Sequence, residues 1–212
     1  PYDTDRDFIT VGKLNSGNFS FIVMADSPFK SWGQLVDHAK KNPGKLKFAH
    51  SGLWGAGHAP ALQLFTEAGI ADKIKMVSYK GGGPALRGFL ARECDFTAQF
   101  KSTIIAQGKK VRVLISAGTQ TAFKGAPTFK ELGYTADIGL MHRVIMAPRG
   151  IPADRLAKLR GALLKVQGFK TYKRLIKAIG ETTDYVDGPD YEKQRPLQSK
   201  AYKAMIAGLK KK

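Results

Sequence analysis

Apolar positions along the first 117 residues follow two alternating patterns. β-branched and aromatic side chains gather in short segments, which predicts strands at residues 8–14, 19–25, 45–50, 75–79, 94–100 and 111–116. Between them, apolar residues recur at helical spacing, which predicts helices at 31–40 and 58–68, one that begins near Pro84, and a short one at 103–108. Strands that alternate with helices in this way indicate a doubly wound α/β sheet with mostly parallel strands.

The character of the chain changes after Gly118. Residues 119–137 are rich in loop-forming residues, with a short helix expected at 128–132. The elements expected after this loop are a strand at 143–147, helices at 152–166 and 169–179, a strand at 182–186 and a last helix at 188–209. The change predicts two domains, residues 13–117 as one and residues 1–12 with 118–212 as part of another.

Composition places the chain among globular proteins. With 212 residues, 43% of them hydrophobic and 25% charged, it can bury a sizeable core. It has no run of about 18 apolar residues, so no transmembrane helix is expected. Cys94 is the only cysteine, which excludes an internal disulfide and favours a buried thiol. Because the sequence opens with Pro1 rather than Met, we expect a processed or trimmed chain.

The net charge of +18 is compatible with a nucleic acid, an anionic surface or an acidic small ligand as partner. The basic residues are spread along the chain, although they become denser toward its end, and no nucleic-acid-binding motif accompanies them. A solvated basic surface is the simpler interpretation. We therefore expect no nucleic-acid partner.

Two glycine-rich turns, at residues 51–57 and 79–83, follow predicted strands and precede predicted helices. Such turns offer backbone N–H groups and the positive end of a helix dipole, which suit a carboxylate or phosphate, although either turn could serve only tight packing. In a parallel sheet both turns would lie at the carboxyl edge, together with Gln99 at the end of the strand at 94–100 and Lys101 directly after it. That shared edge is the expected ligand site.

No catalytic constellation can be assembled from the sequence. Ser51 lacks the preceding glycine of a nucleophile elbow, and His50 and His58 lack a third metal ligand. Acidic residues fall mostly on predicted helix surfaces. We therefore expect a protein that is not an enzyme and that uses no metal and no cofactor.

A set of short motifs occurs in a characteristic order. The motifs are Tyr2-Asp3 with Asp7-Phe8, the stretch from Lys41 to Leu46, Ser51-Gly52 with His58, the stretch from Tyr79 to Leu86, Ala126-Pro127-Thr128 with Glu131 and Gly133-Tyr134, and Ala147-Pro148 with Gly150-Ile151-Pro152. Together they resemble the Bug-type receptors of tripartite tricarboxylate transporters, over nearly the whole chain. The resemblance implies a periplasmic-binding-protein-like (type II) fold, in which two α/β lobes close on a ligand, often an organic acid.

The resemblance further implies a periplasmic protein that captures a small carboxylate and delivers it to a membrane permease. Residues 51–58 match the ligand loop of the family's second lobe, and residues 79–82 match its second turn. The family has about a hundred residues before the Tyr-Asp motif, so we expect the N-terminal portion of the first lobe to be absent. The candidate ligand contacts are Ser51, Gly52, Leu53, Trp54, Gly55, His58, Tyr79, Lys80, Gly81, Gly82, Gln99 and Lys101.

The sequence departs from the family pattern at this site. Trp54 and glycines replace small hydroxyl residues, and Gln99 stands where an acidic residue is common. With Lys101 nearby, the loss of that acid favours an anionic ligand. Two alternatives stay open, the effector-binding domain of a transcription regulator and a basic nucleic-acid-binding module. Sheet edges exposed by an incomplete lobe could also pair two copies into a homodimer.

Overall fold

The computed structural model describes residues 2–210 except 56, 119–122, 135–139 and 182. The chain forms two compact units. The central unit consists of Gly17–Met141, and the terminal unit of Pro1–Ser16 with His142–Lys212. These bounds differ from the expected 13–117, and each unit is described by itself.

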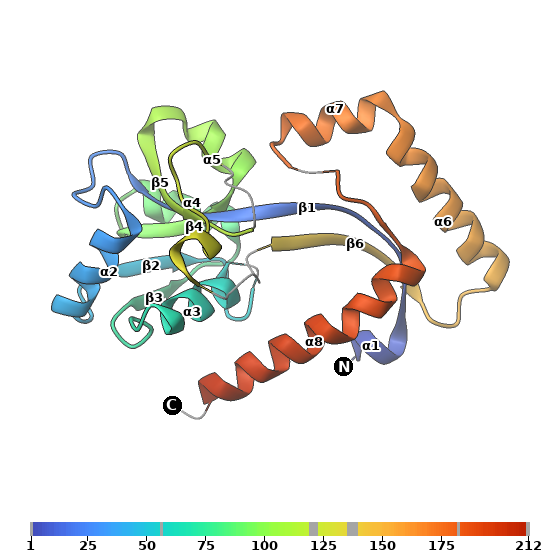
Figure 1. Ribbon diagram of the computed structural model, residues 1–212, viewed down its shortest axis with the longest axis horizontal. Coiled ribbons are helices and arrows are strands. Elements are labelled where there is room, and N and C mark those ends of the chain that lie inside the picture. The colour runs from blue at the N-terminus through green and yellow to red at the C-terminus, as the bar shows by residue number, and fades with distance from the viewer. Residues whose placement is uncertain (1, 56, 119–122, 135–139, 182, 211–212) are drawn as a thin grey trace. The chain divides into compact units, whose positions relative to one another are not determined.

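Five strands form the sheet of the central unit, in the order β3-β2-β4-β1-β5 (Figure 1). They are β1 (Phe8–Met24, with its second half in this unit), β2 (Lys47–His50), β3 (Lys75–Ser78), β4 (Phe96–Phe100) and β5 (Val111–Ser116). β2 runs parallel to β3 and β4, whereas β1 runs antiparallel to β4 and β5. Because only β1 opposes the others, the prediction of a mostly parallel α/β sheet is confirmed.

Helices cover both faces of this sheet. They are α2 (Trp32–Lys41), α3 (His58–Glu67), α4 (Gly82–Leu90) and α5 (Lys101–Gln107), with the 3-10 turns η1 (Gly108–Lys110) and η2 (Lys130–Leu132). Successive side chains of β1 point to opposite faces. Phe21 packs in the core formed with α2 and α3, while Ile22 packs in the core formed with α4 and α5. Two helices thus cover each face, as the doubly wound pattern predicts.

Local sequence signals set several element boundaries as predicted. The Ser31 hydroxyl caps α2 by accepting a hydrogen bond from the Gln34 amide at 3.3 Å. Pro84 lies in the first turn of α4, where its missing N–H leaves no helical bond unmade. Gly180 follows α7 (Lys170–Ala178) with a φ of +70°, the left-handed conformation that ends many helices.

The segment after β5 belongs in part to the central unit. Ser116 forms a bridge with Thr128, and the buried Phe129 ring lies 5.9 Å from the ring of Phe21. The short helix expected at 128–132 is the 3-10 turn η2. These contacts extend the unit beyond residue 117, and local sequence did not reveal them because the partners of this segment lie in the core.

The terminal unit contains the first half of β1, β6 (Leu140–Pro148, from His142 on), β7 (Val186–Asp187), the short helix α1 (Thr4–Asp7), α6 (Ala153–Gly168), α7 and α8 (Gly188–Lys210). Both β6 and β7 pair with β1. The strand expected at 182–186 is only the two-residue β7, and Thr182 lies outside the described residues. A small core of Val11, Ala147 and Leu163 holds the unit, with Tyr185 packed against it.

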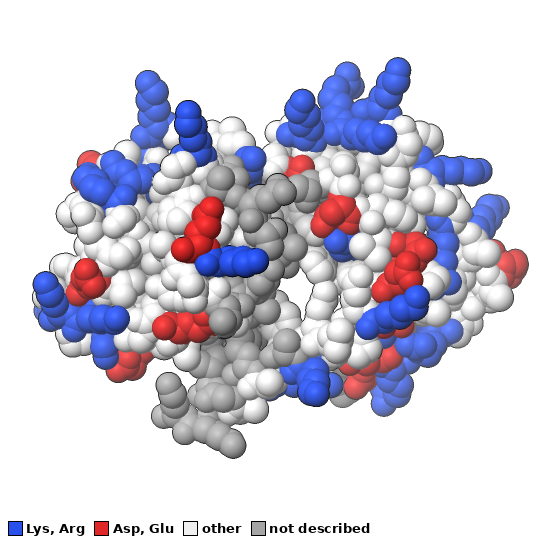
Figure 2. All heavy atoms as spheres, in the orientation of Figure 1, with Lys and Arg blue, Asp and Glu red and all other residues white. Residues whose placement is uncertain are grey.

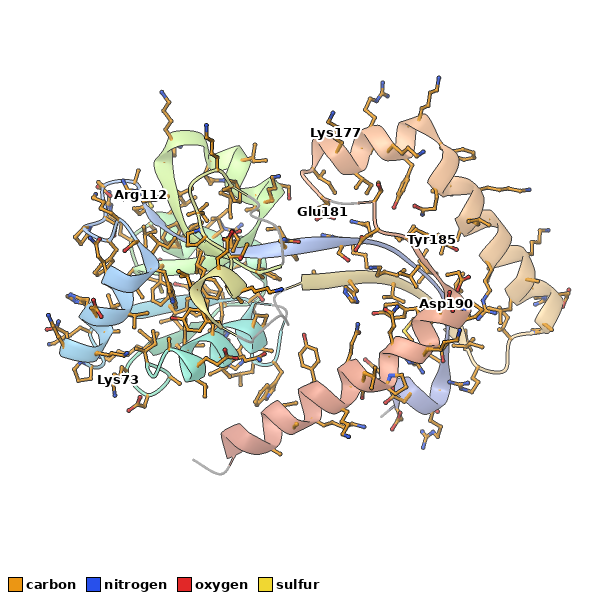
Figure 3. The ribbon with its side chains drawn as sticks, viewed as in Figure 1. Lys73, Arg112, Lys177, Glu181, Tyr185 and Asp190 are labelled. Carbon is orange, nitrogen blue, oxygen red and sulfur yellow. The ribbon has the colours of Figure 1, made fainter. Side chains whose placement is uncertain are left out.

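β1 continues without interruption where the sequence predicted a break between two strands. Asn15 and Ser16 are buried in it, at 2% and 1% exposure. The Asn15 side-chain amide donates to Glu181 at 2.5 Å, and the Ser16 hydroxyl donates to Asp184 at 2.7 Å. Glu181 lies in the segment between α7 and β7 (Figure 3). Polar residues that looked like a turn are therefore strand residues whose partners lie more than 160 residues away.

Candidate functional site at the carboxyl edge of the sheet

Three parallel strands of the central unit end at one edge of the sheet. β2 ends at His50 and β3 at Ser78, and these two residues pair across the strands. β4 pairs with β2 through Ala49 and Thr97, which brings the end of β4 to the same edge. The carboxyl edge of parallel strands is where open α/β sheets bind their ligands. α3, α4 and α5 follow β2, β3 and β4 respectively.

The structure brings the two glycine-rich turns into contact. A side chain at Gly52 would lie 3.8 Å from the Tyr79 carbonyl oxygen, so the backbones of the two turns approach closely. Gly52 and Gly81 have φ values of +116° and +114°, which side-chain-bearing residues rarely adopt. Gln99 joins the turns to β4, because its buried side-chain amide donates to the Gly82 carbonyl at 3.3 Å.

Several backbone amides of the turn before α3, and of the start of α3, are hydrogen bonded to carbonyls of the same turn. The Gly55 carbonyl accepts from the amide of His58 at 2.9 Å and from that of Ala59 at 3.2 Å. Pro60, next in the first turn, has no N–H. The Gly55 amide in turn donates to the Gly52 carbonyl at 3.2 Å. The prediction that the start of α3 offers free amides to a ligand is therefore wrong for these residues.

The start of α4 is open in a way that the start of α3 is not. Gly82 and Gly83 are exposed in its first turn, and no side chain caps the helix. None of the described hydrogen bonds occupies the amides of these two glycines. A side chain at Gly82 would meet nothing within 4 Å. The first turn of α4 is therefore exposed, with the N–H groups of two glycines at the positive end of the helix dipole. Gly83 was not among the predicted contacts, although Pro84 signals where the helix begins.

The side chain of Tyr79 points away from this edge. Its hydroxyl donates to Glu93 at 2.6 Å and contacts the Cys94 sulfur at 3.7 Å. The ring occupies the space that a side chain at Gly88 would need, at 2.3 Å from the hydroxyl oxygen. The hydrogen bond to Glu93 and burial raise the pKa of this tyrosine. Only the backbone of Tyr79 therefore borders the turns.

His50 and His58 form a buried pair beside the turn between β2 and α3. Their ring centres are 4.5 Å apart, and their exposures are 3% and 4%. The Nδ1 atom of His50 lies 3.1 Å from the Gly52 carbonyl oxygen. Burial, together with the neighbouring His50, lowers the pKa of His58 to about 4, so His58 is neutral at pH 7. Its Nδ1 atom accepts a hydrogen bond from the Trp54 amide at 3.1 Å.

The remaining predicted contacts differ in how they lie. Leu53 and Trp54 are exposed, and Lys80 is exposed beside Gly81. Ser51 is half-buried, with its hydroxyl 3.3 Å from where a side chain at Gly55 would begin. The Lys101 ammonium lies 5.9 Å from the centre of the Phe123 ring, in cation–π contact. The carboxyl edge therefore offers both apolar and basic side chains.

The described residues hold no group of three or more His, Cys, Asp or Glu side chains that could bind a metal ion. Among the same residues, no helix combines the length and apolar character that crossing a membrane requires. Basic side chains stand at many places on the face drawn in Figure 2, with a dense group over α6 and α7. The charge of the protein is thus not confined to the carboxyl edge.

Solved structures define the class of protein that has this fold. A protein described as a periplasmic transporter aligns over 98% of this chain and 70% of its own, with a TM-score of 0.85 and 24% identity. The periplasmic binding protein BugD aligns over 95% of this chain and 69% of its own, with a TM-score of 0.83 and 20% identity. The fold is that of periplasmic binding proteins.

Sequence comparison identifies the family. Residues 1–210 match the tripartite tricarboxylate transporter family receptor, TctC. The chain belongs to this family, whose members are solute-binding receptors and not enzymes. The expected Bug-type resemblance is therefore confirmed.

Curated relatives agree with this assignment. The Cupriavidus necator "UPF0065 protein in gbd 5'region" is 26% identical over 98% of this chain and 64% of its own length. BugT of Bordetella pertussis is 28% identical over 71% of this chain and 47% of its own length. The chain thus spans between about half and two thirds of the length of these relatives.

Proposed function

We propose that this chain is part of a periplasmic receptor that captures a small carboxylate at the carboxyl edge of its central sheet. The observation that carries the proposal is the exposed first turn of α4, where no described hydrogen bond occupies two glycine amides, close to the turn before α3. Such a helix terminus binds anions through its N–H groups and its dipole. The exposed Lys80 adds positive charge beside it.

Ligands of related structures support the same ligand class. MatC from Rhodopseudomonas palustris was determined with bound malate, at 20% identity and a TM-score of 0.77. A second R. palustris protein was determined with adipate, at 22% identity and a TM-score of 0.79. Both ligands are small carboxylates. Family membership supports delivery of the captured ligand to a membrane permease.

Two variants at one position test the role of the α4 amides. Gly82→Pro removes one amide at the helix position that best accepts proline, whereas Gly82→Ala keeps the amide and adds a methyl group that meets nothing within 4 Å. A hydrogen bond to a charged group contributes about 1.5–3 kcal/mol, so we expect Gly82→Pro to weaken carboxylate binding roughly 10- to 100-fold. Gly82→Ala should bind nearly as the unchanged protein does.

Calorimetry with di- and tricarboxylates, amino acids and inorganic cations gives the measurement. Thermal unfolding of both variants checks that each is folded. Equal carboxylate affinity of the two variants would show that the Gly82 amide does not bind the ligand. Binding of cations or uncharged ligands alone would overturn the proposed ligand class.

Homodimerisation through sheet edges stays a prediction. β3 is the edge strand of the central sheet, and it begins with the exposed Lys75, a residue type that discourages edge-to-edge pairing. Sedimentation equilibrium over a range of concentrations would decide between one and two copies.

A further inference from the structure

We propose that Trp54 is an aromatic platform in the ligand site, and that the preferred ligand is a monocarboxylate with a flat aromatic body. This inference rests on the proposed function, because it assigns a ligand class to the same site. Trp54 lies in the turn between β2 and α3, whose backbone touches the turn that opens α4.

The exposure of Trp54 sets it apart from the other tryptophan of the chain. Trp32 is 1% exposed and packs in the central core, whereas Trp54 is 45% exposed. Its neighbour Leu53 is 72% exposed. Two large apolar side chains therefore stand in solvent beside glycine amides suited to an anion. Neither side chain is needed for the core of the described structure.

The backbone of Trp54 is held in an unfavourable conformation. Its φ is +58°, a left-handed value that costs a residue with a side chain roughly 1–2 kcal/mol. The Trp54 amide donates to Nδ1 of His58 at 3.1 Å, and the two rings meet edge to face with centres 5.5 Å apart. His58 is itself fixed by burial and by its contact with His50. His58 is thus a positioning residue for Trp54, and strain of this kind is often found where a side chain has a binding role.

The hydrogen bonding of the turn between β2 and α3 indicates which part of a ligand would lie against that turn. The Gly55 carbonyl of this turn accepts hydrogen bonds from the first amides of α3, and the Trp54 amide donates a hydrogen bond to His58. These amides are therefore not available to a second carboxylate on this side of the site. The indole face offers instead a surface on which a planar ring can stack, an interaction worth about 0.5–1.5 kcal/mol beyond the area it buries. One carboxylate at α4 and an aromatic ring at Trp54 satisfy both features.

The test compares benzoate and phenylacetate with succinate and citrate by calorimetry on the full chain. We expect the aromatic acids to bind at least tenfold more tightly than succinate. Because Trp32 is buried, stacking on Trp54 should also change the fluorescence of the exposed tryptophan. Trp54→Ala should abolish both the preference and the fluorescence change, and Trp54→Phe should keep part of the preference. Ile105→Ala, which truncates another exposed apolar residue of the same unit, should leave both unchanged.

His58→Ala and His58→Gln test the positioning role. We expect His58→Ala, which removes the acceptor of the Trp54 amide, to lose the preference for aromatic acids. His58→Gln, whose side-chain oxygen can accept that hydrogen bond, should keep part of the preference, a rescue that general loss of structure would not give. Tighter binding of succinate or citrate, unaffected by Trp54→Ala, would overturn this inference and leave the proposed function standing. Absence of binding by every acid would overturn the proposed function itself. A change of oligomeric state in Trp54→Ala, without a change of ligand preference, would assign Trp54 to an interface and overturn the inference.

Discussion

His58 connects a buried position to the surface of the turn before α3. Its ring is 4% exposed, and burial first, then the neighbouring His50, lower its pKa to about 4. In the neutral form Nδ1 accepts the Trp54 amide hydrogen. A protonated ring would carry hydrogen on both nitrogens and could not accept that bond. Loss of the bond would also release Trp54 from its left-handed conformation.

The stability of the protein should therefore depend on pH through His58. An unfolded histidine has a pKa near 6.5, so as the pH falls below that value the unfolded chain takes up the proton before the folded one does. The contribution of neutral His58 is fully present above pH 6.5 and is lost as the pH falls through about 4. We expect this site to remove about 2–3 kcal/mol of unfolding free energy between pH 7 and pH 4.

Urea unfolding at pH 7, 5.5 and 4 measures this dependence in the unchanged protein and in His58→Gln. Glutamine can accept a hydrogen bond but does not titrate, so the variant should lose less stability on acidification. Carboxylates titrate equally in both proteins and cancel in the difference. Parallel stability curves for the two proteins would contradict the assignment.

Residue-level prediction succeeded where the neighbours in the chain decide the outcome. The helical spacing of Trp32, Leu35, Val36 and Ala39 correctly indicated a buried face. The direction of the Tyr79 side chain could not be predicted, because it depends on Gly88 leaving room in α4 and on Glu93 accepting the hydroxyl hydrogen. The closed start of α3 likewise depends on how the Gly55 carbonyl turns, which the sequence does not specify.

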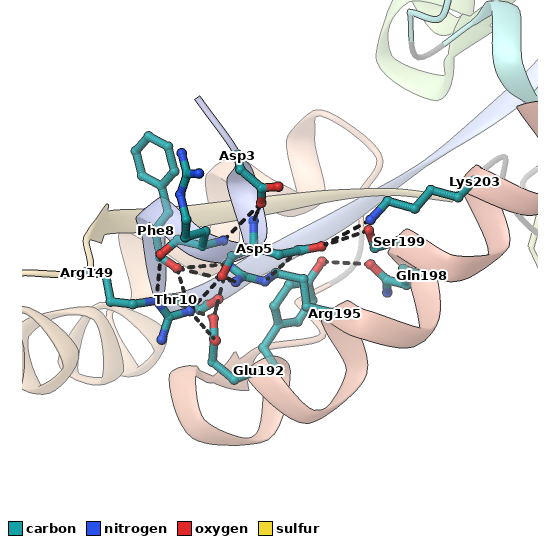
Figure 4. Close-up of polar contacts among 12 residues, drawn as sticks. Asp3, Asp5, Phe8, Thr10, Arg149, Glu192, Arg195, Gln198, Ser199 and Lys203 are labelled. Carbon is teal, nitrogen blue, oxygen red and sulfur yellow. Dashed lines mark hydrogen bonds and ion pairs between the residues drawn. The ribbon is translucent and has the colours of Figure 1, made fainter. Parts of the chain in front are cut away.

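At the scale of elements, α1 is too short to be stable alone and is held by α8 and by Arg149. Arg195 of α8 donates to the carbonyls of Asp5, at 3.1 Å, and Phe8, at 3.3 Å (Figure 4). Arg149, after β6, donates to the same two carbonyls at 2.9 and 3.0 Å. Two guanidinium groups thus satisfy the backbone at the junction of α1 and β1. Hydrogen bonds from residues in the later part of the chain thereby hold the first helix of the chain in place.

Arg195→Lys should destabilise the terminal unit by about 1–3 kcal/mol. The side chain of Arg195 is 12% exposed, and a lysine ammonium cannot reproduce the planar fork that serves both carbonyls. Lys203→Ala is the matched control, because its ammonium lies 3.9 Å from Asp5 with the side chain 75% exposed, and such pairs contribute little. Thermal unfolding of the three proteins gives the comparison. Equal effects of the two substitutions would contradict a specific role for the Arg195 fork.

Element prediction failed where distant partners change the meaning of a local pattern. The Asn-Ser-Gly-Asn stretch at 15–18 has the composition of a turn, yet it continues β1. Its polar groups are satisfied by Glu181, by Asp184 and by the carbonyl of Ala117. A buried polar group without such partners would be costly in a strand, and nothing within the stretch indicates that partners exist.

At the scale of the whole molecule, the two units differ in how much apolar surface they bury. The cores of the central unit include the fully buried side chains of Phe21, Phe48, Phe65, Phe89 and Phe96. The buried cluster of the terminal unit is smaller, namely Val11, Ala147 and Leu163, and among its described residues Ile176 and Tyr191 are also buried. Large apolar residues are exposed on its helices or directly next to them, namely Leu159, Leu164, Phe169, Leu175, Ile179, Leu197 and Tyr202. Because burial of apolar area is the main stabilising contribution, the terminal unit should open more easily.

The long strand β1 allows this difference to be measured within one element. Its residues 19–23 pair with β4 and β5 in the central unit, while residues 12 and 13 pair with β7 in the terminal unit. We expect amide hydrogen exchange in peptides covering residues 8–13 to be at least tenfold faster than in peptides covering 19–23, since tenfold corresponds to about 1.4 kcal/mol of opening free energy. Exchange read by mass spectrometry at neutral pH, in the regime where closing outpaces exchange, gives the ratio. If the two halves of β1 exchange at the same rate, the units open together and the strand transmits the stability of the central core along its whole length.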